Sequence, residues 1–142
     1  MSDAHDKTLD ALEAYLKQKL KDNPQLLLPN AHNVYVDERK YLKYLFGGSN
    51  KKGLTKGALI TKILGYGLHN YRQLDSAVRK AISEFPARFR AITAFGVDYE
   101  IVVILKGITK PKAKVILGAL VDKSNSRVTS IYIKEISQED FT

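Results

Sequence analysis

Lysines gather in a glycine-punctuated stretch, residues 47–57, that runs into an apolar segment predicted to be a helix. Lys51, Lys52 and Lys56 lie here, and Lys56 is expected to open the helix. Free backbone N–H groups and the positive end of the helix dipole would add to these charges, and together they favour binding of a phosphate. The spacing of a Walker A loop is absent. The alternative interpretation is a solvated lysine loop between two helices.

A second set of polar side chains lies in the C-terminal half of the chain, where the sequence predicts strands. If these strands form an antiparallel meander, basic and hydroxyl side chains stand together on an outward face of the sheet: Arg88, Arg90, Lys106, Lys112, Lys114, Arg127, Thr129 and Tyr132. Basic groups with tyrosines between them suit single-stranded RNA, whose phosphates are neutralised and whose bases stack. The alternative is an ordinary solvated sheet face that carries lysines.

Cleavage of RNA without a metal needs three kinds of group. A base activates the 2′-hydroxyl, an acid protonates the leaving 5′-oxygen, and cations stabilise the charge of the phosphorane. Lysine, arginine, tyrosine, threonine and histidine can fill these roles. His69, in a polar turn, is a candidate proton shuttle, with a surface or capping role as the alternative.

Other kinds of catalytic site find little support in the sequence. The carboxylates are scattered, and each has an explanation as a helix cap, a turn or a surface residue: Glu13, Glu38, Glu84, Asp98 and Glu100. There is no nucleophile elbow and no dinucleotide-binding fingerprint. The chain has no cysteine, which excludes thiol catalysis and Cys-ligated zinc, and its three histidines are far apart in sequence. We therefore predict neither a metal nor a cofactor.

The charge of the chain is concentrated in its middle. The formal net charge is +8, but residues 31–134 contain 19 basic and 7 acidic residues, a net of +12. A basic body of this kind favours a polyanionic partner, most simply nucleic acid. A membrane surface is the competing partner, but it would need a basic amphipathic helix with exposed bulky apolar residues, and the sequence contains no clear case of one. No apolar run approaches the roughly 20 residues that span a bilayer.

The hydrophobic pattern predicts helices first and strands afterwards, in one α+β domain of residues 25–142 preceded by an N-terminal helical appendage, residues 1–24. Leucines at three- and four-residue steps predict an amphipathic helix over residues 3–22, and Asn23-Pro24 ends it. This helix can pack on the body, dimerise, or be a remnant of a longer chain. Further helices are predicted over residues 37–46, 58–64 and 70–85.

From residue 88 the apolar period changes to two, which predicts four strands at residues 88–95, 98–106, 112–121 and 127–136. Connections this short favour an antiparallel meander. We expect the helices to cover one face of this sheet and the other face to be open.

Several short motifs follow one another as they do in a family of bacterial toxin domains. They are Leu28-Pro29-Asn30-Ala31, the helix of residues 40–45, Lys56, Leu64-Gly65-Tyr66, residues 70–74, residues 95–100, Gly107, Lys114-Val115 and Arg127-Val128-Thr129. Over residues 28–136 the chain resembles the C-terminal toxin domains of contact-dependent or secreted effectors. Those domains belong to the barnase/EndoU/colicin/RelE-like ribonuclease superfamily.

This resemblance implies a metal-independent ribonuclease that acts on RNA, often tRNA, and that a cognate immunity protein neutralises. It implies a cytoplasmic site of action after delivery from another cell within a larger effector. By motif, Lys56 matches the basic helix-start position of the family, and Arg127 with Thr129 matches the last-strand position.

The roles follow from this picture. Lys56 and Arg127 are expected to converge on one phosphate and stabilise the phosphorane, Thr129 or Tyr132 to position it, and His69 to move a proton. The expected RNA-binding residues are Lys51, Lys52, Arg88, Arg90, Lys112 and Lys114. The alternative is a non-catalytic module that binds RNA, DNA or another protein.

Overall fold

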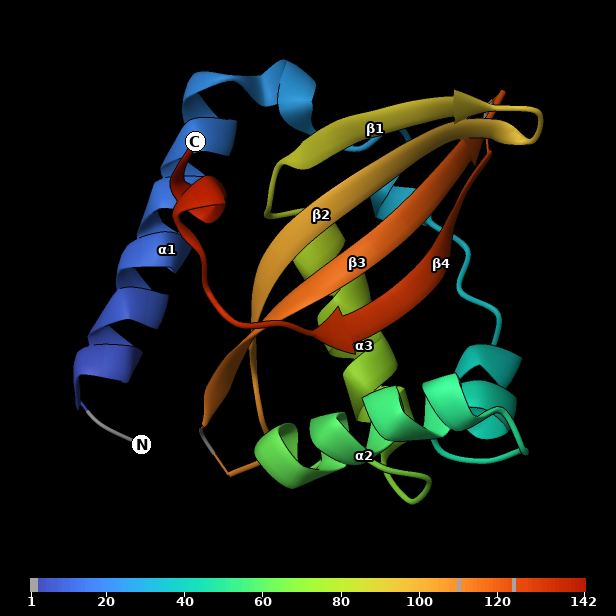
Figure 1. Ribbon diagram of the computed structural model, residues 1–142. Helices are drawn as coiled ribbons and strands as arrows, with labels where there is room; N and C mark the ends of the chain where they lie inside the picture. Colours follow the sequence, from blue (N-terminus) through green and yellow to red (C-terminus); the bar gives the residue numbers. More distant parts are fainter. Residues whose placement is uncertain (1–2, 110, 124) are drawn as a thin grey trace.

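The computed structural model describes residues 3–109, 111–123 and 125–142. In this part of the chain four antiparallel strands form a sheet in the order β1-β2-β3-β4, which Figure 1 shows. Their bounds are Ala87–Thr93, Gly96–Lys106, Lys112–Asp122 and Asn125–Ile133. The predicted α+β class and the antiparallel meander are confirmed.

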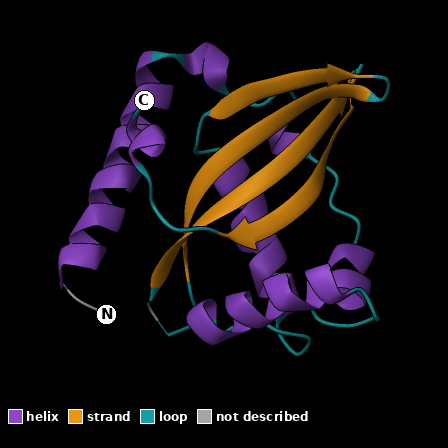
Figure 2. Ribbon diagram, in the orientation of Figure 1, coloured by secondary structure: helices purple, strands orange, loops and turns teal. Residues whose placement is uncertain are grey.

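Figure 2 distinguishes helices from strands by colour, and in the chain the three α-helices precede the sheet. The α-helices are α1 (Asp3–Asp22), α2 (Lys51–Leu64) and α3 (Tyr71–Ile82). Short helical segments lie between α1 and α2: η1 (Pro24–Leu26), η2 (Ala31–Asn33) and η3 (Lys40–Leu45). Another, η4 (Gln138–Phe141), follows the sheet. The helix predicted over residues 37–46 is a π-helix, η3, in which the Phe46 N–H donates to the Tyr41 carbonyl at 2.9 Å.

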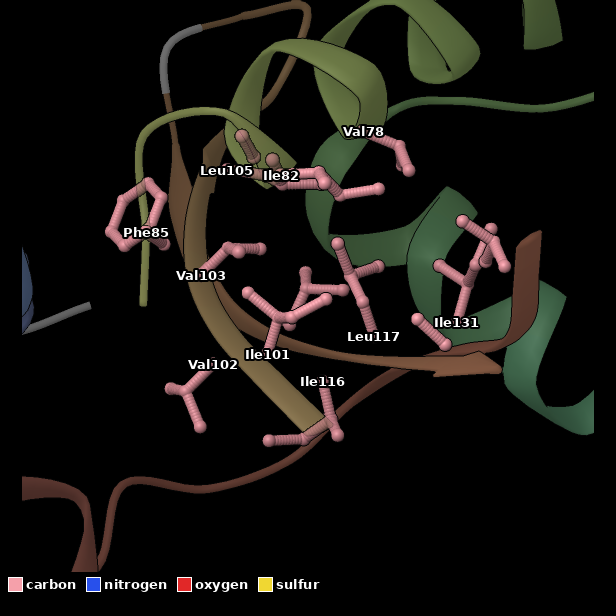
Figure 3. Close-up of a cluster of buried hydrophobic side chains, with 14 of the residues drawn as sticks. Val78, Ile82, Phe85, Ile101, Val102, Val103, Leu105, Ile116, Leu117 and Ile131 are labelled. Carbon is pink, nitrogen blue, oxygen red and sulfur yellow. The ribbon is translucent and has the colours of Figure 1, made fainter. Parts of the chain in front are cut away.

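One face of the sheet carries most of the hydrophobic core, and we call it the core face. Ile101 and Leu117 are paired across β2 and β3, and both are fully buried. Figure 3 shows these side chains pointing toward α3, where Val78 and Ile82 meet them. In the same figure Val102 and Ile116 point to the opposite side of the sheet, as the alternation of side chains along a strand requires.

That opposite side, the second face, is half covered. Val102, Ile104 and Ile116 are buried there, and α1, which contacts β2, β3 and η4, contributes Leu12 and Leu16 to the same core. The second face is therefore not open throughout, because α1 packs against part of it. The apolar stripe of α1 needs a surface to pack on, and the apolar positions of the second face supply it.

Helix α2 begins earlier than predicted, at Lys51, so Lys56 lies in its second turn and not at its start. The Asn50 side chain caps the helix by accepting from the Gly53 N–H at 3.1 Å. Gly53 and Gly57 suggested a loop, but both are buried against η3. A Cβ at Gly57 would lie 1.7 Å from the Leu45 carbonyl oxygen, so these glycines allow close packing of two helices.

Candidate functional site

The uncovered part of the second face, which we call the open half, consists of two rows of residues paired across the strands. The first row is Arg88, Glu100, Gly118 and Ser130, and the second is Ala91, Asp98, Leu120 and Arg127. Paired residues of neighbouring strands point to the same face. The open half thus gathers charged and hydroxyl side chains from all four strands.

Two β-bulges add further polar groups to the open half. The register of β1 against β2 shifts between Phe89 and Ala91, which leaves Arg90 unpaired. The register of β4 against β3 shifts beside Gly118, which leaves Thr129 unpaired. Bulges redirect side chains and are common beside active sites. Here both bulges lie in edge strands next to the first row.

Gly118, in the middle of the first row, keeps this surface hollow. A Cβ at this position would lie 2.4 Å from Ser130 Oγ and 2.9 Å from Thr129 Oγ1. The missing side chain therefore leaves both hydroxyl groups accessible. Among the described residues neither hydroxyl has a hydrogen-bond partner, so both are available to a ligand.

Glu100 is the carboxylate of the first row. Its side chain is 20% exposed and pairs with Arg90 at 2.7 Å. Arg88 faces Glu100 in the register and also approaches the Glu139 carbonyl oxygen at 3.4 Å. Glu100 also borders a crevice of about 320 Å³ between α1 and the sheet. Glu100 thus lies in the same row as Gly118 and Ser130 and is held there by its ion pair with Arg90.

Lys56 reaches the border of the open half from α2. Its Nζ lies 5.7 Å from the centre of the Tyr44 ring and 5.2 Å from that of Tyr132 on β4, distances typical of cation–π contacts. Lys40 lies 4.9 Å from the Tyr44 ring centre, and its Nζ donates to the Thr129 carbonyl at 2.8 Å. The structure therefore brings Lys56 and Tyr132 together, and Lys40, which shares the Tyr44 ring with Lys56, contacts the backbone of Thr129.

Arg127 lies apart from Lys56. It precedes Tyr132, which contacts Lys56, by five residues on β4, about 16 Å along a strand, and among the described residues no contact joins it to Lys56, so the predicted convergence of the two cations on one phosphate finds no support. Its side chain is exposed, and among the described residues it has no ion-pair partner. The cations of the open half are thus spread along its length.

His69 lies outside the site. It is exposed in the loop after α2, whereas Lys56 is eight residues before the last residue of that helix, about 12 Å along the axis. The predicted role of His69 as a proton shuttle therefore has no support from its position. Lys51 and Lys52 are exposed in the first turn of α2.

Lys112 and Lys114 belong to the covered half of the second face and not to the open half. Lys114 is 3% exposed, and its Nζ lies 2.6 Å from Asp140 Oδ2. Lys112 pairs with Asp10 and Glu13 of α1, both at 3.2 Å. Hydrogen bonds to these two carboxylates raise the pKa of Lys112 above its ordinary value. The prediction that Lys114 stands outward to bind RNA is wrong, because its side chain is buried and its ammonium group is paired with Asp140.

A further polar network lies on the other side of the molecule. The Tyr41 hydroxyl donates to Asp75 at 2.8 Å, and Asp75 pairs with Arg79 at 2.8 Å. Burial, and then the hydrogen bond to Asp75, raise the pKa of Tyr41 well above its usual range. Because Arg79 also donates to the Val34 carbonyl at 2.8 Å, the network joins η3 and α3 to the segment after η2.

Two kinds of site find no support in the part of the chain that the structure describes. It contains no group of three His, Asp or Glu side chains placed to hold a metal ion. Nor does any helix within residues 3–109, 111–123 and 125–142 have both the length and the apolar character needed to cross a membrane.

Sequence reasoning missed several residues of this site. Glu100 was grouped with the scattered carboxylates. Four further residues were not predicted as site residues: Gly118, Ser130, Tyr44 and Lys40. One signal for Glu100 was present: alternate positions of β2 change from the buried Ile104 and Val102 to Glu100 and Asp98. That change marks the point where the cover of the second face ends.

Comparison with known proteins places the chain in a family. It belongs to the family described as domain of unknown function (DUF6883), whose model matches residues 27–135. The matched segment contains both rows of the open half and leaves α1 outside. No curated protein and no solved structure matches the chain significantly. The description of the family assigns no activity, so the resemblance to ribonuclease toxins stays a prediction.

Proposed function

We propose that the protein binds single-stranded RNA along the open half and cleaves it without a metal. The observation that carries this proposal is the row that places Glu100, with its partner Arg90, across the hollow at Gly118 from the hydroxyls of Thr129 and Ser130. Hydroxyls and spaced cations on an open sheet suit an extended polyanion.

Glu100, on one side of the hollow at Gly118, acts as the base, and Lys56, on the other side, acts as the acid. The proton of the ribose 2′-hydroxyl passes to the Glu100 carboxylate, and the 2′-oxygen attacks the adjacent phosphorus. The bond from phosphorus to the 5′-oxygen breaks, which gives a 2′,3′-cyclic phosphate and a 5′-hydroxyl end. The leaving 5′-oxygen takes its proton from the Lys56 ammonium group, and Thr129 and Ser130 donate hydrogen bonds to the phosphoryl oxygens.

The spacing of these groups allows this division. Tyr132, which holds Lys56, lies two strands across and two residues along from Glu100, so their Cα atoms are about 12 Å apart in an ideal sheet. A phosphodiester bound over Gly118 would lie between Glu100 and Tyr132, since Gly118 is paired with Glu100 on one side and with Ser130 of β4 on the other. The resemblance adds tRNA as the substrate, an immunity protein as the inhibitor and a toxic effect in the cytoplasm.

The proposal is tested by incubating the protein with total tRNA in EDTA. We expect discrete fragments that carry 2′,3′-cyclic phosphates, and no cleavage of an oligonucleotide with a single 2′-deoxy substitution at the cut site. Lys56→Ala is expected to lower the rate about 10²- to 10³-fold, because it removes a group that acts on the transition state. Its affinity for RNA should fall much less.

The matched control is Lys62→Ala, which removes an exposed lysine from the last turn of the same helix. Its cleavage rate should equal that of the wild type. A wild-type protein that binds tRNA but yields no fragments would overturn the catalytic part of the proposal and favour the binding module. Growth of cells that express the wild-type chain in the cytoplasm, without any loss of viability, would contradict the toxic effect.

A further inference from the structure

A groove of about 640 Å³ lies at the end of the open half beyond the second row. Figure 1 shows that the β1–β2 connection, the end of β3 and the start of β4 lie at this end of the sheet. The groove is lined by side chains that include Tyr35, Phe95, Leu120, Asp122, Asn125 and Arg127. Only Arg127 among these belongs to the predicted catalytic and RNA-binding residues.

Tyr35 is a fixed and exposed aromatic platform on one wall of the groove. Its N–H donates to the Ser126 carbonyl at 2.8 Å, and its carbonyl accepts from the Val128 N–H at 2.9 Å. The flanking Val34 and Val36 are buried, so the alternation of an extended chain directs the Tyr35 ring outward. The side chain is 60% exposed.

Phe95 lies at the tip of the β1–β2 hairpin, on the other side of the groove. Its N–H donates to Thr93 Oγ1 at 3.1 Å, and the Thr93 hydroxyl donates to the Gly96 carbonyl at 2.9 Å. Gly96 has φ +138°, which closes the two-residue turn. The ring is 75% exposed on this ordered turn, so its role is not to fill the core.

We propose that this groove binds an unpaired nucleobase, stacked on Tyr35 and Phe95, while Arg127 holds the adjoining phosphate. The inference rests on the proposed function, since it names the feature of single-stranded RNA that the site recognises. Every base offers a flat π face, and stacking on aromatic side chains is a major part of single-strand binding. Arg127 links the groove to the open half, because it lies in the second row.

The polar groups of the groove favour a base over an apolar protein segment. The Asn125 amide offers donors and an acceptor, and the Asp122 carboxylate offers acceptors, at the rim of an aromatic surface. A nucleobase has a flat apolar face and a polar edge, and it meets both requirements. An apolar peptide side chain would leave these polar groups without partners on binding.

The test compares two single-stranded ligands that differ only in their bases. One is oligodeoxythymidylate, which has no 2′-hydroxyl and so is not cleaved by the proposed route. The other is an abasic deoxyribose-phosphate oligomer of the same length. We expect the wild type to bind the thymidylate more tightly. Tyr35→Ala and Phe95→Ala should each weaken thymidylate binding about five- to hundred-fold and leave abasic binding unchanged.

The matched control is Ile92→Ala, since Ile92 is 79% exposed on the same hairpin and does not line the groove. It should bind both oligomers as the wild type does. Equal binding of both oligomers by the wild type would overturn the base site and leave the proposed RNA binding intact. If neither oligomer binds, the base site is overturned, and the cleavage of tRNA in EDTA decides separately whether the proposed function stands.

A spectroscopic test follows from the composition, because the chain contains no tryptophan. Phe95→Trp places a single indole at the groove and keeps an aromatic ring there. Its fluorescence should be quenched by thymidylate and unaffected by the abasic oligomer. Ile92→Trp, on the same hairpin outside the groove, should respond to neither. A Trp at position 95 that does not respond to bound thymidylate would contradict stacking.

Discussion

Both halves of the second face carry charged residues, but the two sets differ in their burial and in their ion-pair partners. In the covered half, Lys114 is buried with Asp140, and Lys112 is tied to Asp10 and Glu13. In the open half, Glu100 meets only Arg90 as an ion-pair partner among the described residues, and Arg127 meets none.

This difference shows that a charge on the sheet is informative only together with what covers it. In the covered half the charged residues pair with side chains of α1 and η4, so their partners belong to the same chain. In the open half equivalent positions face solvent next to unpartnered hydroxyls. We therefore assign stability to the first set and ligand binding to the second, and the following predictions test that assignment.

Removal of residues 1–24 should have the largest effect on stability. Leu9, Leu12 and Leu16 of α1 are all buried, and burial of a leucine contributes about 1.5–3 kcal/mol. The shortened chain should therefore lose about 5 kcal/mol or more, a large part of the stability of an ordinary domain. Urea unfolding of both chains measures this loss. A shortened chain as stable as the full one would mean that α1 is an appendage after all.

Lys114→Met should destabilise the protein by about 3–5 kcal/mol, because it leaves the buried Asp140 carboxylate without its partner. Arg127→Ala, in the open half, should change the stability by no more than about 0.5 kcal/mol, because Arg127 is exposed. The comparison uses the free energy of unfolding from urea titrations. Equal losses in the two variants would remove the distinction between the halves.

Gly118→Ala, in the open half, should lower the rate of cleavage much more than it lowers the stability. The new Cβ fills the hollow and moves the Ser130 and Thr129 hydroxyls, and a displacement of about 1 Å at a site can cost about 10²-fold in rate. These side chains can rotate toward solvent, so the stability should fall by only about 1 kcal/mol. Cleavage of tRNA in EDTA and urea unfolding give the two numbers. Undiminished cleavage would show that the hollow holds no phosphate.

The pair between Lys112 and α1 gives the smallest effect and a pH dependence. The pKa of Lys112 is raised, so its contribution is complete below the ordinary value of 10.5 and is lost as the pH rises through the raised value. Because the side chain is 37% exposed, the contribution should be below about 1 kcal/mol. Wild type and Lys112→Gln should therefore differ in urea unfolding at pH 8, and the difference should shrink as the pH rises above 10.5 and through the raised pKa. A difference that stays constant over this rise in pH would contradict this origin.

The sequence predicted the fold well because the decisive signals were local. The period of two gave four strands within about three residues of their observed bounds, and the leucine spacing gave α1. The start of α2 was misplaced because Gly53 and Gly57 look like loop residues until η3 is packed against them. The place of Lys56 beside Tyr44 depends on that same contact.

The site was predicted only in part, because it depends on pairings between distant segments. Lys56 and Tyr132 were predicted and do lie together, and Thr129 is linked to them only through Lys40 and Tyr44. The two bulges that turn Arg90 and Thr129 toward the open half depend on strand register, which a hydrophobic pattern does not contain. Nor did the sequence alone show which lysines α1 would cover.

The most direct test of the central claim replaces two carboxylates by their amides. One is Glu100 of the open half, and the other is Glu13 of α1, whose partner Lys112 lies in the covered half. Glu100 and Glu13 are similarly exposed, at 20% and 25%, and each pairs with basic side chains. Glu100→Gln should lower the rate of tRNA cleavage in EDTA about 10²- to 10⁴-fold, the usual contribution of a general base, while RNA affinity does not fall. Glu13→Gln should cleave at the wild-type rate. Equal cleavage by the two variants would contradict the assignment of the reaction to the open half.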